Sequence, residues 1–230
     1  MRDRTSPAAR GAKQTAVSLD IVLCTPHDRS LTVLLVRGAA GGREKWTLPW
    51  AWFTAGTSPD DRASHVIADA LGARPGWLAQ LGATGDDRRH PGGAALSIGY
   101  AAVTAARDRA PAATAQWFPA GRLPPLAPRH AALVATAQLA LRERLDTAPI
   151  AFRLLPATFT LTDLQNVYEL LLGRRVHKAS FRRSLQAAWL VEPTDEWRSE
   201  GRGRPAQLFR YAPRKRRGGR RGVRFELLGG

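Results

Sequence analysis

Two helical patterns follow one another near the C-terminus, and they constrain the fold more than any other feature of the sequence. The first is expected over residues 161–172, with apolar side chains on one face and Gly173 as its stop. The second is expected over residues 178–189 after a short basic turn, with Phe181 and Leu185 on its buried face. Two short amphipathic helices joined by a short turn predict a helix-turn-helix.

The opposite face of the second helix is polar and basic, as a helix that lies in a DNA major groove requires. Its candidate DNA contacts are Lys178, Ser180, Arg182, Arg183 and Gln186. Strands expected at 190–193 and 207–211 enclose a Gly-Arg-Gly-Arg-Pro segment, and such a hairpin is the wing of a winged helix. We expect Arg202 and Arg204 in this wing to reach phosphates or a narrow minor groove. The alternative interpretation is a solvated charged face on a small helical bundle.

The charge of the chain points in the same direction. The formal net charge is +16. Residues 151–230 contain 17 Lys and Arg against 7 Asp and Glu, so +10 of this charge lies there. A basic surface of this kind indicates a polyanionic partner. Residues 1–14 and 214–230 are expected to be a disordered basic arm and tail that add salt-sensitive, nonspecific affinity.

The first part of the chain predicts a mixed α and β domain. The expected elements are a strand pair at 17–24 and 31–36, a helix at 59–71, strands at 76–82 and 94–104 around a loop at 85–93, and a closing helix at 129–145. The aromatic segment before the first helix is expected to be loop-like. Cys24, the single cysteine, is interpreted as a buried small hydrophobe. No membrane span or secretory signal is recognisable, so a cytoplasmic protein is expected.

This order of elements resembles the Nudix fold, and the helix at 59–71 carries a degraded Nudix box. With its last glycine placed on Gly72, the box covers residues 51–73. The resemblance puts the family's Arg-Glu pair on His65 and Val66, and its Glu-Glu pair on Asp69 and Ala70. Apolar residues thus occupy two positions at which the family has metal-binding glutamates. One aspartate cannot bind the Mg²⁺ that would activate water for attack on a pyrophosphate. We therefore predict no catalytic residues, no metal and no cofactor.

The chain as a whole resembles the Nudix-related transcriptional regulators, the NrtR family. The stretches that carry the likeness include Leu34-Leu35-Val36-Arg37, Lys45-Trp46-Thr47-Leu48-Pro49, Ser97-Ile98-Gly99-Tyr100, Phe159-Thr160-Leu161, Phe181-Arg182-Arg183 and Gly201-Arg202-Gly203-Arg204-Pro205. The resemblance implies an α+β protein, with a Nudix-like α/β/α sandwich domain followed by a small winged helix-turn-helix domain. We place the sensor and dimerisation domain at 15–148 and the DNA-binding domain at 149–213.

In this family the Nudix-like domain typically senses ADP-ribose or another nucleotide-linked metabolite. The candidate ligand-binding residues here are Arg37, Trp46, Trp52, Phe53 and Asp86. Where the family usually has Gly-Gly after the first proline, this chain has Trp50-Ala51. Bulky side chains there would fill space in which a phosphate approaches backbone amides, so we predict a pocket that is altered or closed. Core packing and ligand stacking remain open for these aromatic residues.

The sequence thus predicts a homodimeric repressor that binds a double-stranded DNA operator and responds to a nucleotide-type effector. One alternative is a Nudix-type nucleotide pyrophosphohydrolase fused to a nucleic-acid-binding module. Another is a protein that binds nucleic acid through charge alone, without sequence preference.

Overall fold

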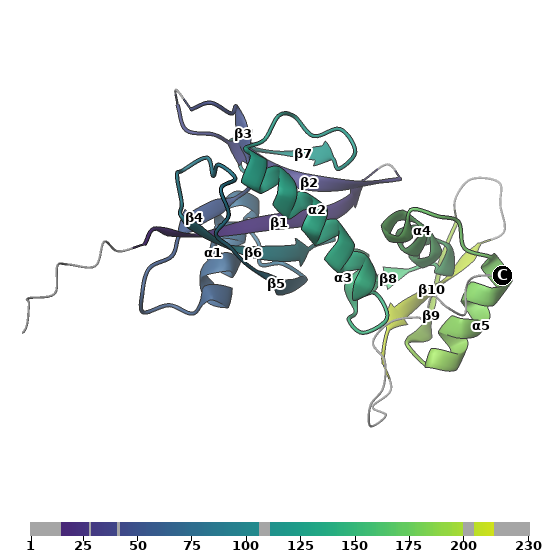
Figure 1. Ribbon diagram of the computed structural model, residues 1–230. Coiled ribbons are helices and arrows are strands. Elements are labelled where there is room, and N and C mark those ends of the chain that lie inside the picture. Colours follow the sequence, from purple (N-terminus) through teal and green to yellow (C-terminus); the bar gives the residue numbers. More distant parts are fainter. Residues whose placement is uncertain (1–14, 28, 41, 106–110, 200–204, 214–230) are drawn as a thin grey trace, which may run out of the picture.

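A computed structural model describes residues 15–213, except 28, 41, 106–110 and 200–204. It consists of a β-sheet with one helix on each face, followed by a smaller unit of short helices and a second sheet (Figure 1). The expected disordered arm at 1–14, the basic tail at 214–230 and both wing arginines, Arg202 and Arg204, lie outside the described residues.

The larger sheet has seven strands, with the order β3-β2-β1-β6-β5, while β4 pairs with β1 and β7 with β2. Its strands are β1 (Val17–His27), β2 (Ser30–Arg37), β3 (Trp46–Thr47), β4 (Trp50–Trp52), β5 (Trp77–Thr84), β6 (Leu96–Val103) and β7 (Ala115–Pro119). β1 runs parallel to β6, and the other pairs are antiparallel.

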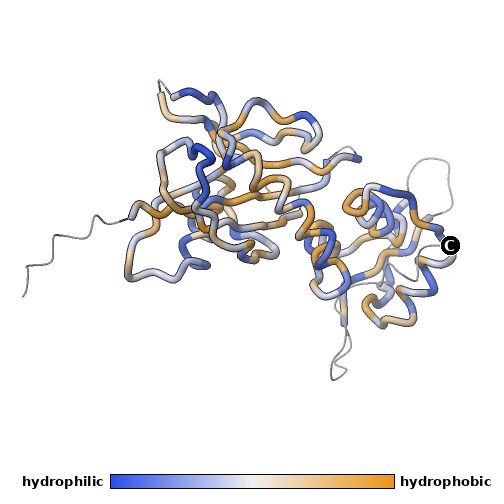
Figure 2. The backbone as a smooth tube through the Cα atoms, in the orientation of Figure 1, coloured by the Kyte–Doolittle hydropathy of each residue, from blue (hydrophilic) through white to orange (hydrophobic). Residues whose placement is uncertain are grey.

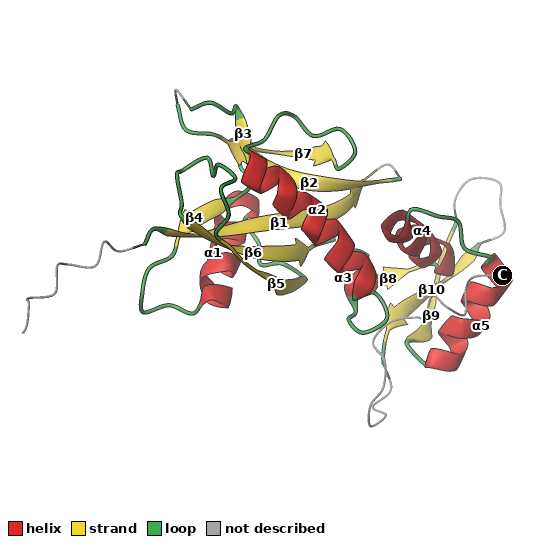
Figure 3. Ribbon diagram, in the orientation of Figure 1, coloured by secondary structure: helices red, strands yellow, loops and turns green. Residues whose placement is uncertain are grey.

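The alternation of side chains along β1 explains why both faces of the sheet are covered. Leu19, Ile21 and Leu23 belong to the core beneath helix α1 (Pro59–Leu71), and Val22 and Cys24 belong to the core beneath helix α2 (Pro128–Glu143). Figure 2 shows the hydrophobic stretches concentrated in these central strands, and Figure 3 shows the two helices against the sheet. The sandwich that the sequence predicted is confirmed.

Helix α1 has the bounds expected from its capping residues. The hydroxyl of Ser58 accepts a hydrogen bond from the backbone N–H of Asp61, Pro59 stands in the first turn, and Gly72 ends the helix with a φ of 71°. A left-handed residue at this position favours glycine because it has no Cβ.

The smaller unit follows α2 without a break in the hydrophobic core. It contains α3 (Ile150–Arg153), β8 (Thr158–Phe159), α4 (Leu161–Leu172), α5 (Lys178–Ala188), β9 (Val191–Arg198) and β10 (Ala206–Tyr211), with the sheet order β8-β10-β9. Its buried Tyr168, Phe181 and Leu185 belong to the same cluster as Leu141 on α2. The two parts of the chain therefore pack directly on one another.

Some elements differ from the prediction. The aromatic segment before α1 is not a simple loop, because Trp46–Thr47 and Trp50–Trp52 form strands that pair with β2 and β1. Strand β7 was not predicted, because its pairing partner, β2, lies some eighty residues away in the sequence and no local pattern indicates such a pairing. No helix within the described ranges is long and apolar enough to cross a membrane.

Candidate functional sites: a nucleic-acid interface and a sensor domain

Helix α5 presents the polar face that the sequence predicted. The side chains of Phe181 and Leu185 are buried against α4, where Phe181 meets the ring of Tyr168 edge-on at 5.3 Å. Burial of this face turns the opposite side outward. Lys178, Arg182, Arg183 and Gln186 are exposed there, and Ser180 is partly exposed beside His177. The DNA-contact roles of these residues remain predictions.

The turn between α4 and α5 adds two arginines that the candidate set omitted. Arg174 and Arg175 are exposed. Glu169 shapes this turn, because its carboxylate accepts hydrogen bonds from the backbone N–H of Val176 and from the side chain of Gln165. From residue 173 to 189 the chain contains five Lys and Arg and no Asp or Glu, so this surface is uniformly basic. The composition of the turn was a signal that could have found both arginines.

Strand β9 of the wing hairpin is hydrogen-bonded to the start of α4 in the helix-turn-helix. Thr160 and Asp163 form a capping box, in which each side chain satisfies the backbone N–H of the other residue. Asp163 also accepts two hydrogen bonds from the guanidinium of Arg198 on β9, at 2.9 and 2.7 Å. These two bonds hold the end of β9 against the start of α4.

In the Nudix-like domain, two of the candidate ligand residues form one pair on the β2–β3 edge. The guanidinium of Arg37 lies 5.3 Å from the ring centre of Trp46. The ring of Phe118 contacts Trp46 edge-on at 5.0 Å, and Trp46 is only 8% exposed. Because Trp46 is buried between these two partners, the geometry favours packing over ligand stacking for it.

Trp52 belongs to a different cluster on β4. Its ring meets Trp50 edge-on at 5.2 Å, and Trp50 in turn meets His90 edge-on at 4.7 Å. Trp52 is 41% exposed, so part of its surface is open to a ligand. Phe53 is partly buried and packs against the core beneath α1. Of these aromatic candidates, Trp52 therefore offers the best surface for stacking.

Asp86, the remaining candidate, lies in the loop at 85–93 and helps to shape it. Its carboxylate accepts a hydrogen bond from the backbone N–H of Arg88 and pairs with the Arg88 guanidinium. The Arg89 side chain forms an ion pair with Glu44, which connects this loop to the segment that precedes β3. The structure thus shows a structural use for Asp86, and its ligand role remains a prediction.

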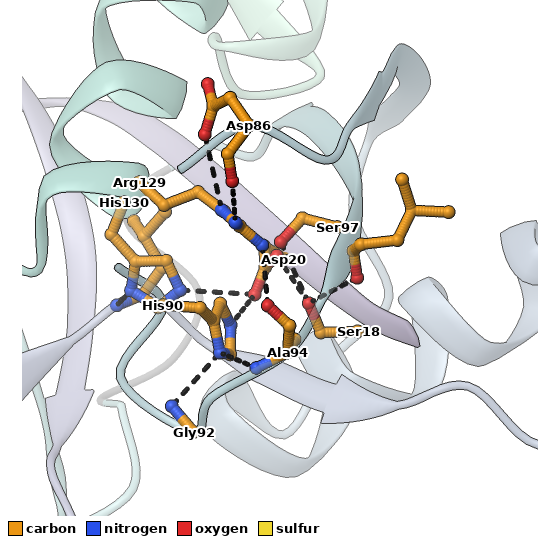
Figure 4. A network of polar contacts seen from close by, with 11 residues as sticks. Ser18, Asp20, Asp86, His90, Gly92, Ala94, Ser97, Arg129 and His130 are labelled. Carbon is orange, nitrogen blue, oxygen red and sulfur yellow. Dashed lines mark hydrogen bonds and ion pairs between the residues drawn. The ribbon is translucent and has the colours of Figure 1, made fainter. Parts of the chain in front are cut away.

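The structure also reveals a buried polar network that the sequence analysis missed. The carboxylate of Asp20 on β1 lies between His90 of the loop and His130 of α2 (Figure 4). Its Oδ1 is 2.9 Å from Nε2 of His90 and 3.1 Å from Nε2 of His130, and its Oδ2 accepts a hydrogen bond from Ser18. All four residues are buried. An aspartate within an apolar strand was the available signal, since a buried carboxylate must find partners.

The network also holds Asp20 in its charged form. Burial opposes ionisation of Asp20, but hydrogen bonds from His130 and His90 outweigh it and bring the pKa of the carboxyl well below its usual value. For His130, burial lowers the pKa, and the opposing attraction of Asp20 does not overcome this effect. The network therefore combines a carboxylate with a neutral His130.

Asp20, His90 and His130 lie close enough to hold a metal ion together, and the protonation of the two rings decides whether they can. Nδ1 of His130 lies 3.1 Å from the backbone nitrogen of Leu48, and Nδ1 of His90 lies 3.0 Å from that of Gly92. A backbone N–H only donates, so both Nδ1 atoms are acceptors and both Nε2 atoms carry the protons. Those Nε2–H groups point at Asp20. The arrangement fits a hydrogen-bonded network and does not fit a metal centre.

The helix that would carry Nudix carboxylates packs its equivalent face into the core. Val66 and Ala70 are buried beneath the sheet, whereas His65 and Asp69 are exposed. His65 forms a hydrogen bond through Nδ1 to the carbonyl of Asp61, in the preceding turn of the helix. The structure thus shows a lone exposed aspartate where a Nudix hydrolase gathers several carboxylates.

Comparison with known proteins gives matches over both parts of the chain. Residues 151–211 match the family model described as the NrtR DNA-binding winged helix domain. A curated relative from Acinetobacter baylyi, the ADPR responsive transcriptional repressor NtrR, is 26% identical over 205 residues, which cover 85% of this chain and 82% of the relative.

Solved structures agree with this result. The NrtR protein of Shewanella oneidensis, in a complex with a 27mer DNA, matches with a TM-score of 0.76 and 29% identity over 86% of this chain and 94% of its own. The Nudix domain of the same protein, in a complex with ADP ribose, matches with a TM-score of 0.50 and 25% identity over 60% of this chain and 94% of its own.

Proposed function

We propose that this chain, which is similar to NrtR-family regulators over both of its parts, is a repressor that binds an operator through its winged helix. The observation that carries the proposal is the uniformly basic surface of α5 and the preceding turn, on a unit that matches the DNA-binding domain of the family. Operator binding requires access to the chromosome, so we expect the protein to act in the cytoplasm.

We assign the DNA contacts to two surfaces. Lys178, Ser180, Arg182, Arg183 and Gln186 would contact the major groove and its phosphates, with Arg174 and Arg175 beside them. Arg202 and Arg204 would extend from the wing. As a homodimer, the protein would place two such units on half-sites about one helical turn apart, roughly 34–36 Å.

Sequence specificity separates this function from binding by charge alone. DNA fragments from the region upstream of the gene and its neighbours would be tested by gel shift against an excess of unrelated competitor. The proposal predicts at least one fragment that survives competition at physiological salt. Equal displacement of all fragments, together with a steep loss of affinity with salt, would instead indicate charge-driven binding.

We further propose that the Nudix-like domain does not hydrolyse nucleotides. The apolar, buried Val66 and Ala70 support this, because they replace the two glutamates on which the family's metal-dependent chemistry depends. Incubation with ADP-ribose and nucleoside diphosphate compounds in the presence of Mg²⁺ is expected to release no product. Metal-dependent turnover at a rate typical of enzymes would contradict the proposal and favour a pyrophosphohydrolase.

For the effector we propose a nucleotide-type metabolite of the ADP-ribose class. The relatives support the class, since one is named as ADPR responsive and another was solved with ADP ribose. Arg37, Trp52 and Asp86 are the proposed contacts, while Trp46 and Phe53, which are more buried than Trp52, would have a packing role. Trp50 occupies the position next to His90, so the pocket should be narrower than in the relatives.

Calorimetric titration with ADP-ribose tests both parts of this proposal. A narrowed pocket predicts binding weaker than micromolar, and Trp50→Gly is expected to strengthen it. Micromolar binding by the unmodified chain would refute the narrowing and retain ADP-ribose as the effector. A complete lack of binding by both proteins would remove ADP-ribose from consideration.

A further inference from the structure

We propose that helix α2 couples the loop at 85–93 to the winged helix, and that Asp20 is the positioning residue that joins this loop to α2. The inference rests on the proposed function, in which the loop borders the effector site. It is supported by contacts at the two ends of α2 and by the buried network in Figure 4.

The first turn of α2 is connected to the loop through two consecutive residues, Arg129 and His130. The guanidinium of Arg129 donates to the carbonyl oxygens of Ala94, at 2.8 Å, and Asp86, at 2.7 Å. The backbone N–H of Arg129 also donates to the carbonyl of Arg89. Because Arg129 is buried, water cannot readily replace these bonds if the loop moves away.

The adjacent residue, His130, makes the second connection through Asp20. Since His130 and His90 donate to the same carboxylate oxygen, neither ring can leave without weakening the compensation of a buried negative charge. Asp20 itself is held by the central strand β1 and by Ser18. A displacement of the loop at His90 therefore alters the hydrogen bonding of Asp20, and through it the bond that Asp20 makes with His130 at the start of α2.

The last turn of α2 reaches the winged helix. Arg142 donates from Nε to the carbonyl of Leu171, at 2.8 Å, at the end of α4. Leu141 and Leu171 belong to the same buried cluster. Figure 1 shows α2 crossing the sheet and ending beside this unit.

Between these ends α2 is suited to transmit a displacement. It contains 16 residues, which correspond to a length of about 24 Å. After Pro128 in its first turn the helix has no proline or glycine, the residues at which helices usually kink. A ligand that moves the loop can thus shift α4 by tilting α2 as one body.

Hydrogen exchange of the full-length protein tests this coupling. In Asp20→Ala, we expect the amides of α4 to exchange faster, by about fivefold or more, the lower end of typical couplings between sites. Asp20→Asn keeps an oxygen that can accept from both histidines, so it should remain close to the wild type. Val66→Ala is the matched control, because it removes a buried side chain on the other face of the sheet.

A second variant keeps the test decisive if Asp20→Ala does not fold. Arg142 is exposed apart from its contact with α4, so Arg142→Ala should fold. Because coupling is reciprocal, it should accelerate exchange of the Gly92 and Ala94 amides, which His90 protects at the far end of α2. The inference is wrong if these amides are unchanged, or if Asp20→Ala affects α4 no more than Val66→Ala does.

Operator binding is measured on the same proteins, with and without ADP-ribose. Normal operator binding without the exchange coupling would overturn this inference alone. Failure of the wild type to bind any operator would overturn the proposed function, while the exchange result would still decide whether α2 couples the two parts.

Discussion

The indole ring of Trp50 lies directly against the backbone of Gly92, so that position 92 has no room for a Cβ atom. Gly92 follows His90 in the loop at 85–93, and Trp50 also contacts the His90 ring. The bulky residue that distinguishes this chain after Pro49 is thus accommodated by a glycine more than forty residues away. The loop and β4 thus pack directly on one another.

We expect Gly92→Ala to destabilise the protein by about 1–3 kcal/mol, the usual cost of overpacking. The added methyl group would have to displace Trp50 or the loop backbone. Chemical denaturation would measure the change, and Gly121→Ala, where the added methyl group meets open space, is the control. In the double variant Trp50→Ala/Gly92→Ala, the cost of the alanine at 92 should largely disappear. If Gly92→Ala costs the same free energy of unfolding with and without the Trp50 side chain, Trp50 does not pack directly on Gly92.

Stability should fall in mildly acidic solution because of His130. Its pKa is lowered in the folded protein, because burial disfavours the imidazolium ion more strongly than the attraction of Asp20 favours it. The unfolded chain takes up this proton near the ordinary pKa, about 6.5. The stabilising contribution is therefore fully present above that pH and is lost as the pH falls, by at most about 1.4 kcal/mol per pH unit.

Urea unfolding at several pH values between 7.5 and 5 would measure this slope. His130→Gln retains a donor and an acceptor but cannot be protonated in this range, so its free energy of unfolding should depend less on pH. Identical slopes for the two proteins would show that His130 does not cause the acid sensitivity.

Arginines on α5 should contribute to DNA affinity according to their position rather than their charge alone. Arg182→Ala and Arg183→Ala each remove an exposed guanidinium from the proposed groove face. Each is expected to weaken operator binding, by about 1–3 kcal/mol for a bidentate base contact, or to lower the salt slope by about one for a phosphate contact. Fluorescence anisotropy at several salt concentrations separates the two cases.

The charge-matched control is Arg74→Ala, which removes an exposed arginine next to the end of α1 in the Nudix-like domain. It should leave operator affinity nearly unchanged. If all three variants weaken binding equally, the contribution of α5 is only its net charge.

Cys24 should be unreactive in the folded protein. It is fully buried in β1, and this burial raises the pKa of its thiol to about 12, so almost no thiolate is present at neutral pH. Reaction with Ellman's reagent at pH 8 should therefore follow the unfolding rate, whereas the denatured chain, with its single cysteine, should release one equivalent at once. Rapid reaction of the native protein would show that β1 is accessible.

Much of this protein was determined locally by its sequence. Helices α1 and α4 have the bounds expected from the sequence, and they begin at the caps Ser58 and Thr160 and end at Gly72 and Gly173, because a cap satisfies backbone groups within a few residues of itself. The basic face of α5 was likewise predicted from the sequence, since helical periodicity alone separates its buried residues from its exposed ones.

The tertiary structure alone decided which distant residues meet. Asp20, His90 and His130 are separated by 70 and 40 positions, and only the packing of a loop and of α2 onto β1 brings them together. The contacts of Trp50 with Gly92 and of Arg142 with Leu171 have the same origin. Local interactions select helices and caps residue by residue, whereas burial of polar groups and the connection between the two domains depend on long-range packing that no short stretch of sequence encodes.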